Sequence, residues 1–534
     1  MSRPRVPPFF VGLFIGLILV GGSLLAFKLF VVNGADPVAA PPPPTTDVSP
    51  PIATQGDDGA EEPAGEQPTT SPAVTTTETT IPFHRFVDRR SVGQPWGSVE
   101  GLLTFRGNPT GTYYGEGPVP QDPRVLWRYP DQPMCSESTN LGVTKVWCGN
   151  GWTGQPVIWV RPDGVTELIF GAYDRKLHFV DAATGQATRA PFLTGDLVKG
   201  TPTIDPNGYP LVYFGSRDNK LRILALDREE PTELWNVEAN LSVAGMWNDD
   251  WDASPRIIDD IMFEGAENSI FYVYKLHRGY DADGKVSVAP EKLFEMEAWT
   301  DELLQSIAGT PYPRAVSIES STALYEGRAY FANSGGRVVG LYIENVESGQ
   351  APVVLDFWVG DDVDATIVID EEGMLYVAAE YERFLPRARE LGQLIKLNPY
   401  RPNDPFVWGV PARGGEGEVG GIWATPALGD GVIYAATQPG NLIAVDTETG
   451  EEFLVDRIGR HAWSSPVVVD DTLIAASCTE EPGQIHAYSL EDPRAPRPLW
   501  TFQPSESCIE ATPAVWHGVI YVGSRDGYLY AVGD

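Results

Sequence analysis

Short runs of alternating apolar and polar residues, separated by turns that contain glycine or aspartate, repeat through residues 100–534. One copy reads Thr512–Val515, a turn, Val519–Gly523, a second turn at Asp526–Gly527, and then Leu529–Val532. A period of two residues predicts β-strands with one buried face. A repeat of several short strands at a roughly regular spacing is typical of a β-propeller or a solenoid.

The copies can be aligned on the small residue, usually proline, that follows the entry to the first strand of each. These eight anchor positions are Pro156, Pro202, Pro255, Thr322, Ile367, Pro426, Pro466 and Pro513. Neighbouring anchors are separated by about the length of one four-stranded propeller blade, with insertions in the longer intervals. The alignment therefore predicts eight blades, with seven as the alternative count.

The last copy holds only three strands, whereas Arg124–Tyr129, upstream of the first full copy, reads as a strand without a sheet. A ring closed by strands from both ends leaves no free sheet edge, so we expect this segment to complete the final blade. The sequence thus predicts an all-β fold, a single β-propeller over residues 84–534 closed by its N- and C-terminal strands. Residues 291–308 are expected to be helical, and residues 380–391 to form a charged hairpin.

The N-terminal segment predicts a membrane anchor. Arg3 and Arg5 precede Phe9–Phe27, an uncharged run that is long enough as a helix to cross a bilayer. We assign residues 1–8 to a short cytoplasmic N-terminus, 9–32 to a transmembrane helix and 33–83 to a disordered Pro/Thr-rich linker. The positive residues before the span place the propeller outside the cell membrane. A cleaved signal peptide, with a site at Val38–Ala40, is the alternative.

Charge and cysteine content narrow the surroundings of the domain. The chain has 38 basic and 73 acidic residues, a net charge of −35, which disfavours nucleic acid as a partner. Four cysteines suit an oxidising compartment, and of the three connectivities we favour Cys135–Cys148 with Cys478–Cys508. Neither a Cys-x-x-Cys motif nor a Cys/His ligand spacing supports a metal site in their place.

One residue of each copy lies three positions before the anchor, where the innermost strand begins at the mouth of the central channel. These eight ring residues are Thr153, Lys199, Asp252, Glu319, Asp364, Trp423, Trp463 and Glu510. Four acids in a narrow mouth repel one another, so we expect a bound cation, protonation of some acids, or pairing with Lys199, Arg460 and water.

Two kinds of binding are predicted at this mouth. Oxygen ligands favour Ca²⁺ or Mg²⁺ over softer metals, and Ca²⁺ is the metal hypothesised at Asp252, Glu319, Asp364 and Glu510. Indole rings stack on sugars, quinones or organic cations, so Trp423 and Trp463, with Lys199 and Arg460, form the predicted ligand-binding residues.

Two phrases of the repeat carry a resemblance to a known family. Phe179–Gly185 and Ala444–Gly450 share the pattern Val-Asp-x-x-Thr-Gly, and together with Thr104–Pro109 they resemble the PQQ-type repeat of quinoprotein-like propellers. The resemblance covers residues 100–534 and implies the propeller fold. It also implies that four tryptophans pack between neighbouring blades: Trp127, Trp235, Trp408 and Trp500. The cofactor PQQ is not favoured, because quinoprotein dehydrogenases usually carry two adjacent cysteines over the quinone and this chain has no adjacent cysteines.

No recognisable catalytic set occurs in the sequence, so we assign no catalytic residue and do not favour an enzyme. The favoured function is that of a membrane-tethered, extracytoplasmic PQQ-like propeller acting as a non-catalytic binding or scaffold protein of the cell envelope. Its partner would be a protein or an envelope component, as for non-enzymatic relatives such as the propeller lipoprotein of the outer-membrane assembly machine. The alternatives are a PQQ- and calcium-dependent quinoprotein oxidoreductase and a carbohydrate-binding propeller.

Overall fold

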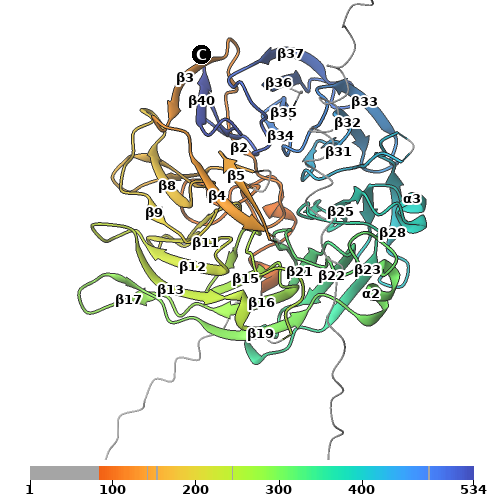
Figure 1. The fold of residues 1–534 in the computed structure, drawn as a ribbon, viewed down its shortest axis with the longest axis horizontal. Helices are drawn as coiled ribbons and strands as arrows, with labels where there is room; N and C mark the ends of the chain where they lie inside the picture. Colours follow the sequence, from red (N-terminus) through yellow and green to blue (C-terminus); the bar gives the residue numbers. More distant parts are fainter. Residues whose placement is uncertain (1–82, 141, 152–153, 243, 416, 479–481) are drawn as a thin grey trace, which may run out of the picture. The chain divides into compact units, whose positions relative to one another are not determined.

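The computed structural model describes residues 83–534, apart from 141, 152–153, 243, 416 and 479–481. Its strands form eight antiparallel sheets of four main strands each, arranged in a ring around a central channel (Figure 1). Each of the eight anchor residues directly precedes the first strand of one sheet, so the predicted eight-bladed propeller is confirmed and the alternative of seven blades is wrong.

The first four blades follow the chain in order, and their innermost strand comes first. Blade 1 consists of β6 (Val157–Val160), β7 (Thr166–Ala172), β8 (Lys176–Asp181) and β9 (Phe192–Leu193). Blade 2 consists of β10 (Thr203–Ile204), β11 (Leu211–Gly215), β12 (Lys220–Ala225) and β13 (Thr232–Glu238). Blade 3 consists of β14 (Arg256–Ile258), β15 (Ile261–Gly265), β16 (Ile270–Lys275) and β19 (Glu291–Glu297). Blade 4 consists of β20 (Ala323–Tyr325), β21 (Arg328–Ala332), β22 (Arg337–Tyr342) and β23 (Val353–Trp358).

The other four blades complete the ring. Blade 5 consists of β24 (Val368–Ile369), β25 (Leu375–Ala378), β27 (Leu394–Leu397) and β28 (Phe406–Val410). Blade 6 consists of β30 (Ala427–Gly429), β31 (Val432–Ala436), β32 (Asn441–Asp446) and β33 (Glu452–Arg457). Blade 7 consists of β34 (Val467–Val469), β35 (Thr472–Cys478), β36 (Gly483–Ser489) and β37 (Arg497–Phe502). Blade 8 combines β38 (Ala514–Trp516), β39 (Val519–Gly523) and β40 (Leu529–Gly533) with an early strand, β3 (Arg124–Tyr129).

Strands from both ends of the described chain close the ring. β3 pairs antiparallel with β40, from Arg124 opposite Gly533 to Tyr129 opposite Leu529, so the predicted outer strand is confirmed (Figure 1). Two further early strands add to inner edges: β1 (Gly101–Leu102) pairs antiparallel with β6, and β2 (Gly115–Glu116) pairs parallel with β38. These pairings cover sheet edges that would otherwise present unpaired backbone groups.

Shorter elements decorate the ring. Three two-stranded sheets are formed by β4 (Cys135–Asn140) with β5 (Val143–Cys148), β17 (Gly279–Tyr280) with β18 (Val286–Ser287), and β26 (Glu380–Tyr381) with β29 (Gly420–Gly421). The 3₁₀ turns are η1 (Phe83–Arg85), η2 (Arg89–Ser91), η3 (Ala239–Leu241) and η4 (Val346–Ser348). The α-helices within the described ranges are α2 (Asp301–Ile307), which Thr300 caps through its hydroxyl, and α3 (Pro386–Leu391).

Two local predictions were wrong. Only the second half of residues 291–308 is helical, because β19 in the first half pairs along its length with β16. The sheet hydrogen bonds therefore override the helix propensity of the glutamates and Lys292. Residues 380–391 contain β26 and the helix α3 rather than a hairpin, and the helix begins with Pro386 at a position where proline is well tolerated.

Neighbouring blades dock through tryptophans of the outer strands, as the resemblance implied. The Trp127 indole N–H donates to the Ala182 carbonyl of blade 1, and the Trp408 indole N–H donates to the Thr447 carbonyl of blade 6. Each ring lies against the glycine that ends a Val-Asp-x-x-Thr-Gly phrase. A Cβ on Gly450 would lie 2.8 Å from the Trp408 ring, and Gly450 also has a φ of +74°. The Val-Asp-x-x-Thr-Gly phrase therefore forms a turn in which the aspartate side chain accepts hydrogen bonds from the backbone of the turn. The glycine at its end leaves room for the tryptophan ring of the preceding blade.

Trp500 and Trp235 occupy the equivalent outer strands. The Trp500 indole N–H donates to the Pro120 carbonyl, beside blade 8, and Trp235 meets Tyr274 of blade 3 edge to face at 5.2 Å. Between blades 3 and 4, Phe271 and Phe331 stack at 4.4 Å. The hydrophobic core is thus divided into clusters that lie between successive blades.

The segment of residues 101–116, here called the axial segment, contacts all eight blades. Its backbone and side chains reach blade 1 through β1, blade 8 through β2, and blades 2 and 3 through the hydroxyl of Thr104. The carbonyls of Pro109 and Thr110 accept from backbone N–H groups of blades 4 and 5. Blades 6 and 7 are reached by Arg106, whose guanidinium donates to the Pro426 and Pro466 carbonyls at 2.9 and 2.6 Å.

Arg106 is fully buried where the innermost strands converge. Its guanidinium lies 4.4 Å from the centre of the Tyr114 ring, and burial lowers its pKa to about 10, so the group is charged at neutral pH. The axial segment therefore places a hydrogen-bonded cation at the centre of the ring, where it binds carbonyls of the neighbouring blades 6 and 7. Among the described residues no helix is long and apolar enough to span a membrane, and the predicted anchor at residues 9–32 lies outside them.

Candidate functional site at the channel mouth

The described ring residues each lie four positions before the innermost strand of their blade, close to where the alignment placed them. Seven of the eight belong to the described residues, and Thr153 does not. They fall into three neighbouring groups around the mouth rather than one uniform ring. Lys199 and Asp252 lie together, Glu319 and Asp364 face Trp423, and Glu510 lies beside a disulfide.

The first group is a buried cluster of two cations and three acids. The Lys199 ammonium forms an ion pair with Asp252 and lies 3.3 Å from Oε1 of Glu267. Beside it, Nε of Arg217 donates to Oδ2 of Asp250 at 2.6 Å. All five residues are at most 8% exposed. Asp250, Asp252 and Glu267 have the spacing of a metal site, but Lys199 supplies a positive charge from the protein itself.

Burial governs the protonation of this cluster. Burial raises the pKa of Asp252 well above its usual range, although the charge of Lys199 opposes the rise. Burial also raises the pKa of Asp250 to about 7, with the charge of Glu267 as the next cause. The pKa of Glu267 lies below its usual value despite burial, because Lys199 and Arg217 stabilise its ionised form. The cluster therefore concentrates its negative charge on Glu267.

The second group holds Glu319 and Asp364. Oε1 of Glu319 accepts from the Ser317 hydroxyl at 3.0 Å, and Oδ1 of Asp364 accepts from the Ser334 hydroxyl at 3.4 Å. Burial raises the pKa of Glu319 well above its usual range, and the neighbouring charge of Asp364 adds to this effect. Protonation of Glu319, one of the three predicted outcomes, would lower the repulsion between these two carboxyls.

A small cavity lies between this group and the first. Its volume is about 10 Å³, which is room for about one water molecule. It is lined by Phe105, Asp252, Glu319, Ser321, Asp364, Thr366, Trp423, Thr425 and Ser465. Three of the predicted metal ligands thus border one space, whereas Glu510 does not.

The indoles form a stack on blades 6 and 7. Trp423 and Trp463 lie face to face at 4.7 Å, and His461 stacks on Trp463 at 5.4 Å. The Trp463 indole N–H donates to the Gln438 side chain. Arg460, also predicted at the site, is an exposed residue next to this stack. One face of each indole ring is therefore covered by the other indole. Trp423 also borders the cavity.

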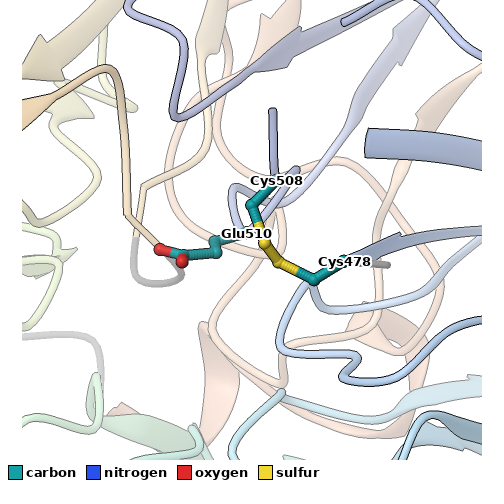
Figure 2. Close-up of side chains that lie close together, drawn as sticks. All are labelled: Cys478, Cys508 and Glu510. Carbon is teal, nitrogen blue, oxygen red and sulfur yellow. A yellow bond between two sulfur atoms is a disulfide. The ribbon is translucent and has the colours of Figure 1, made fainter. Parts of the chain in front are cut away.

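Glu510 belongs to a third group with the predicted disulfide Cys478–Cys508 (Figure 2). The disulfide joins the end of β35 in blade 7 to the segment before blade 8, as expected, and Cys135–Cys148 closes the β4–β5 hairpin. In Figure 2 the Glu510 carboxylate points away from the sulfurs. Its Oε2 lies 3.7 Å from Nε of Arg525. The two sulfurs are bonded to one another, so they are not thiolate ligands in this state.

Another acidic group near the mouth also contains a cation from the protein. Nη1 of Arg383 lies 3.4 Å from Asp361, 3.5 Å from Asp362 and 4.0 Å from Glu382. Asp362, Asp364 and Glu380 have the spacing of a metal site, and Arg383 neutralises part of their charge. Arg383 belongs to residues 380–391, which were predicted to form a charged hairpin, so its burial was not expected.

The aligned repeat also contained a signal that was not used. The residue directly before the anchor carries a hydroxyl in seven copies, namely Thr201, Ser254, Ser321, Thr366, Thr425, Ser465 and Thr512. In the structure several of these hydroxyls accept from the backbone N–H at the same position of the preceding blade, as in Ser321 to Thr366 and Thr366 to Thr425, both at 3.0 Å. This chain of hydrogen bonds links the blades around the channel.

Replacing Thr366 with valine is expected to lower the free energy of unfolding by about 1–2 kcal/mol, since the buried N–H of Ser321 would lose its acceptor in a site of almost unchanged shape. Chemical denaturation monitored by tryptophan fluorescence measures this loss. Thr232→Val, on the exposed start of β13, is the matched control and should change little. Equal stability of both variants would mean that the inter-blade hydrogen bonds contribute nothing.

The eight-bladed ring is a β-propeller, and two of its outer tryptophans, Trp127 and Trp408, dock on the Val-Asp-x-x-Thr-Gly turns that resemble the PQQ-type repeat. Residues 392–533 match the family model described as outer membrane protein assembly factor BamB. A comparison with curated protein sequences gave no match.

One solved structure supports the fold, and two others give lower scores. The quinohemoprotein alcohol dehydrogenase of Comamonas testosteroni superposes with a TM-score of 0.54 at 14% identity, over 83% of this chain and 81% of that one. Sqt1 of Saccharomyces cerevisiae gives a TM-score of 0.49 at 8% identity, over 72% of this chain and 95% of that one. The computationally designed protein Ika8 gives a TM-score of 0.47 at 12% identity, over 69% of this chain and 93% of that one. At these identities the likeness concerns the fold alone.

Proposed function

We propose that this chain is a membrane-tethered, extracytoplasmic propeller that binds a protein partner of the cell envelope at its channel mouth, without catalysis. The observation that carries this proposal is that the mouth is filled by its own side chains. Lys199, Arg217, Arg383 and Arg525 pair with its acids, and the indoles stack on one another. Such a mouth offers a formed recognition surface and little room for a substrate.

The residues of the mouth do not fit PQQ. A tricyclic quinone needs a flat slot of several hundred cubic ångströms, in the range of ordinary ligand pockets. The space bordered by Asp252, Glu319, Asp364 and Trp423 is about 10 Å³, and Trp463 already covers one face of Trp423. This disagreement weighs against the quinoprotein oxidoreductase, and the same size argument weighs against a sugar ring in the cavity.

Three further observations support the compartment and the kind of partner. Both cysteine pairs form disulfides, which suits an oxidising compartment. The sequence carries the apolar run Phe9–Phe27 after Arg3 and Arg5, as expected of a tether. The family matched by residues 392–533 is described by the name of an assembly factor, which favours a protein partner.

The β4–β5 hairpin is the part of the mouth best placed to meet a partner. The ring of Trp147 in β5 lies within 5.8 Å of Arg217 and 5.3 Å of Arg525, so the hairpin is held at the mouth. The neighbouring Val146 is 65% exposed. An exposed aliphatic residue on a disulfide-closed hairpin is a rigid apolar contact for a partner.

Photo-crosslinking in cells tests the proposal on the full-length chain. A photoreactive residue at position 146 is expected to give a crosslinked product of defined mass, because this side chain faces the partner. The control is position 454 on β33 of blade 6, an equally exposed leucine at 67%. Absence of a product from position 146, or the same products from both positions, would contradict a partner at the mouth.

A thermal-shift experiment with Ca²⁺ and PQQ tests the enzymatic alternative on the purified chain. No rise in melting temperature above about 1 °C is expected with PQQ at saturating Ca²⁺, since a ligand that does not bind the folded state cannot stabilise it. A larger rise, accompanied by quinone absorbance on the protein, would favour the oxidoreductase.

A further inference from the structure

The outer edge of each blade is protected against pairing with a further strand. In blades 2–8 the outer strand shows a register shift against the strand that it pairs with, of the kind that a β-bulge makes. In blade 1 the outer strand β9 is only two residues long. Bulges and very short strands are two means by which proteins stop an exposed edge from pairing with another chain. The rim of the propeller therefore disfavours added strands.

The β4–β5 hairpin at the mouth lacks this protection. Its register runs over six residue pairs, from Cys135 opposite Cys148 to Asn140 opposite Val143, without a shift. Among the described residues the two strands form a sheet of their own, with no third strand on either side. The other two-stranded sheets of the described chain have only two residue pairs each. The hairpin thus presents a longer and more regular edge than these sheets do.

Backbone groups of β5 point to the free side of the hairpin. In an antiparallel ladder, residue pairs alternate between those that bond to one another and those whose N–H and C=O groups point outward. The Glu137 carbonyl accepts from the Arg175 guanidinium, outside the hairpin, so the Glu137–Val146 pair is of the outward kind. The N–H and C=O groups of Val146 and, two residues earlier, of Thr144 therefore face away from β4. No hydrogen bond joins these groups to another described residue.

The two edges of the hairpin differ in access. β4 lies toward blade 1, where the Ser136 hydroxyl donates to the Tyr173 carbonyl at 2.6 Å. On β5, by contrast, Val143 is 38% exposed and Val146 is 65% exposed. β-Branched residues of this kind favour an extended backbone. The edge of β5 is therefore the side of the hairpin that a partner can reach.

The hairpin is held in place before any strand is added. The disulfide Cys135–Cys148 joins its two strands at the base. The Trp147 ring meets Tyr173 edge to face at 5.7 Å and lies 5.3 Å from the Arg525 guanidinium. A fixed edge loses little conformational freedom when a strand pairs with it, and this favours binding.

We propose that the free edge of β5 accepts an extended strand of the partner protein by β-augmentation. The N–H and C=O groups of Thr144 and Val146 bind the main chain of the added strand, and neighbouring side chains select its sequence. Val143 and Val146 favour apolar side chains next to them. A second copy of this chain is disfavoured as the partner, because each copy carries a net charge of −35. This inference rests on the proposed function and specifies how the partner is recognised.

Proline at position 144 tests the main-chain contact on the full-length chain in cells. Thr144→Pro removes an N–H that points outward, so the β4–β5 ladder keeps its own bonds while the proline ring blocks the edge. The photoreactive residue at position 146 is expected to give about tenfold less crosslinked product in this variant, as expected for the loss of a hydrogen bond together with a steric clash.

Thr139→Pro is the matched control. Thr139 lies opposite Thr144, and the two hydroxyls are 2.7 Å apart, so both proline variants lose the same side-chain hydrogen bond. The N–H of Thr139 points outward on the β4 side, so this variant should crosslink as the unaltered chain does. Thr144→Val also loses the hydroxyl but keeps the N–H, and it should crosslink at nearly the full yield.

Amide hydrogen exchange gives a second readout that needs no proline variant. The crosslinked complex is purified through a tag on the full-length chain, and its exchange is compared with that of the free chain. A strand paired with β5 is expected to slow exchange at positions 144 and 146 by about tenfold or more, since hydrogen-bonded amides are protected. Exchange in β33 of blade 6, Glu452–Arg457, should not change.

Four results would overturn the inference. Equal crosslinking from Thr144→Pro and Thr139→Pro, or unchanged exchange at positions 144 and 146 in the complex, would leave a partner at the mouth and remove the strand pairing. A product made of two copies, or a crosslink within one chain, would assign the edge to this protein itself. Absence of any crosslink from position 146 would contradict the proposed function, and this inference with it. Circular dichroism identifies a proline variant that fails to fold, and the exchange measurement then decides.

Discussion

Replacing Arg106 with alanine is expected to lower the free energy of unfolding by about 3–5 kcal/mol. The guanidinium is fully buried and donates to the carbonyls of Pro426 and Pro466 in blades 6 and 7. Its removal leaves two buried acceptors without donors and opens a space against Tyr114, and each of these losses costs about 1–3 kcal/mol. Chemical denaturation followed by tryptophan fluorescence and by circular dichroism measures the change.

Two other variants make this result specific. Arg106→Lys keeps a charge but reaches fewer carbonyls, so it should recover part of the loss. Arg497→Ala, on the outer strand β37, removes an exposed arginine that pairs with Glu491 and should cost less than about 1 kcal/mol. A similar small loss for Arg106→Ala would mean that the axial segment does not hold the blades together.

The stability of the domain is expected to fall as the pH rises from about 4 to about 7. Burial raises the pKa of Asp361 to about 7 from an ordinary value of 3.8, although Arg383 opposes the rise. Between these two values the folded chain keeps a proton that the unfolded chain has released, so each rise in pH favours unfolding. Asp250, whose pKa burial also raises to about 7, acts in the same direction.

For Asp361 alone, the free energy of unfolding falls by on the order of 4 kcal/mol. The fall is complete above about pH 7 and has not begun below about pH 4. Denaturation midpoints at a series of pH values measure it. Asp361→Asn stays neutral and keeps an oxygen for the backbone N–H groups of Glu382 and Arg383, so its stability should depend less on pH. Asp131→Asn, at an exposed position, should follow the unaltered chain. If the stability of both variants depends on pH in the same way, ionisation of the buried Asp361 carboxyl is not the cause of the pH dependence.

The fold could be predicted closely because each blade repeats the same local rules. Alternation defined the strands, the anchor residues defined where each blade begins, and the unpaired segment Arg124–Tyr129 defined how the ring closes. The two local errors arose where an insertion interrupts the repeat. At β19 and at α3 the structure depends on which neighbour supplies hydrogen bonds, and the local sequence does not contain that information.

The candidate site was predicted in position but not in its charge balance. The alignment brought Asp252, Glu319, Asp364 and Trp423 to one mouth, since residues at the same place in each copy share a level of the ring. The arginines that pair with the acids of the mouth come from other positions in the repeat. Arg217 and Arg525 follow the second strand of a blade, and Arg383 lies in an insertion, so no comparison of equivalent positions could place them beside the acids.

The pairing of β3 with β40 has a consequence for how the protein is made. A strand near the start of the propeller waits for its partner until nearly the whole domain has been synthesised. Until then β3 has no partner strand, and its edges stay exposed. The axial segment likewise lacks the later blades that it contacts. Ring closure therefore depends on contacts between distant parts of the sequence, which fold slowly. A chain that lacks β40 would carry an open sheet edge, a feature that chaperones and proteases recognise, so closure of the ring distinguishes a complete propeller from an incomplete one.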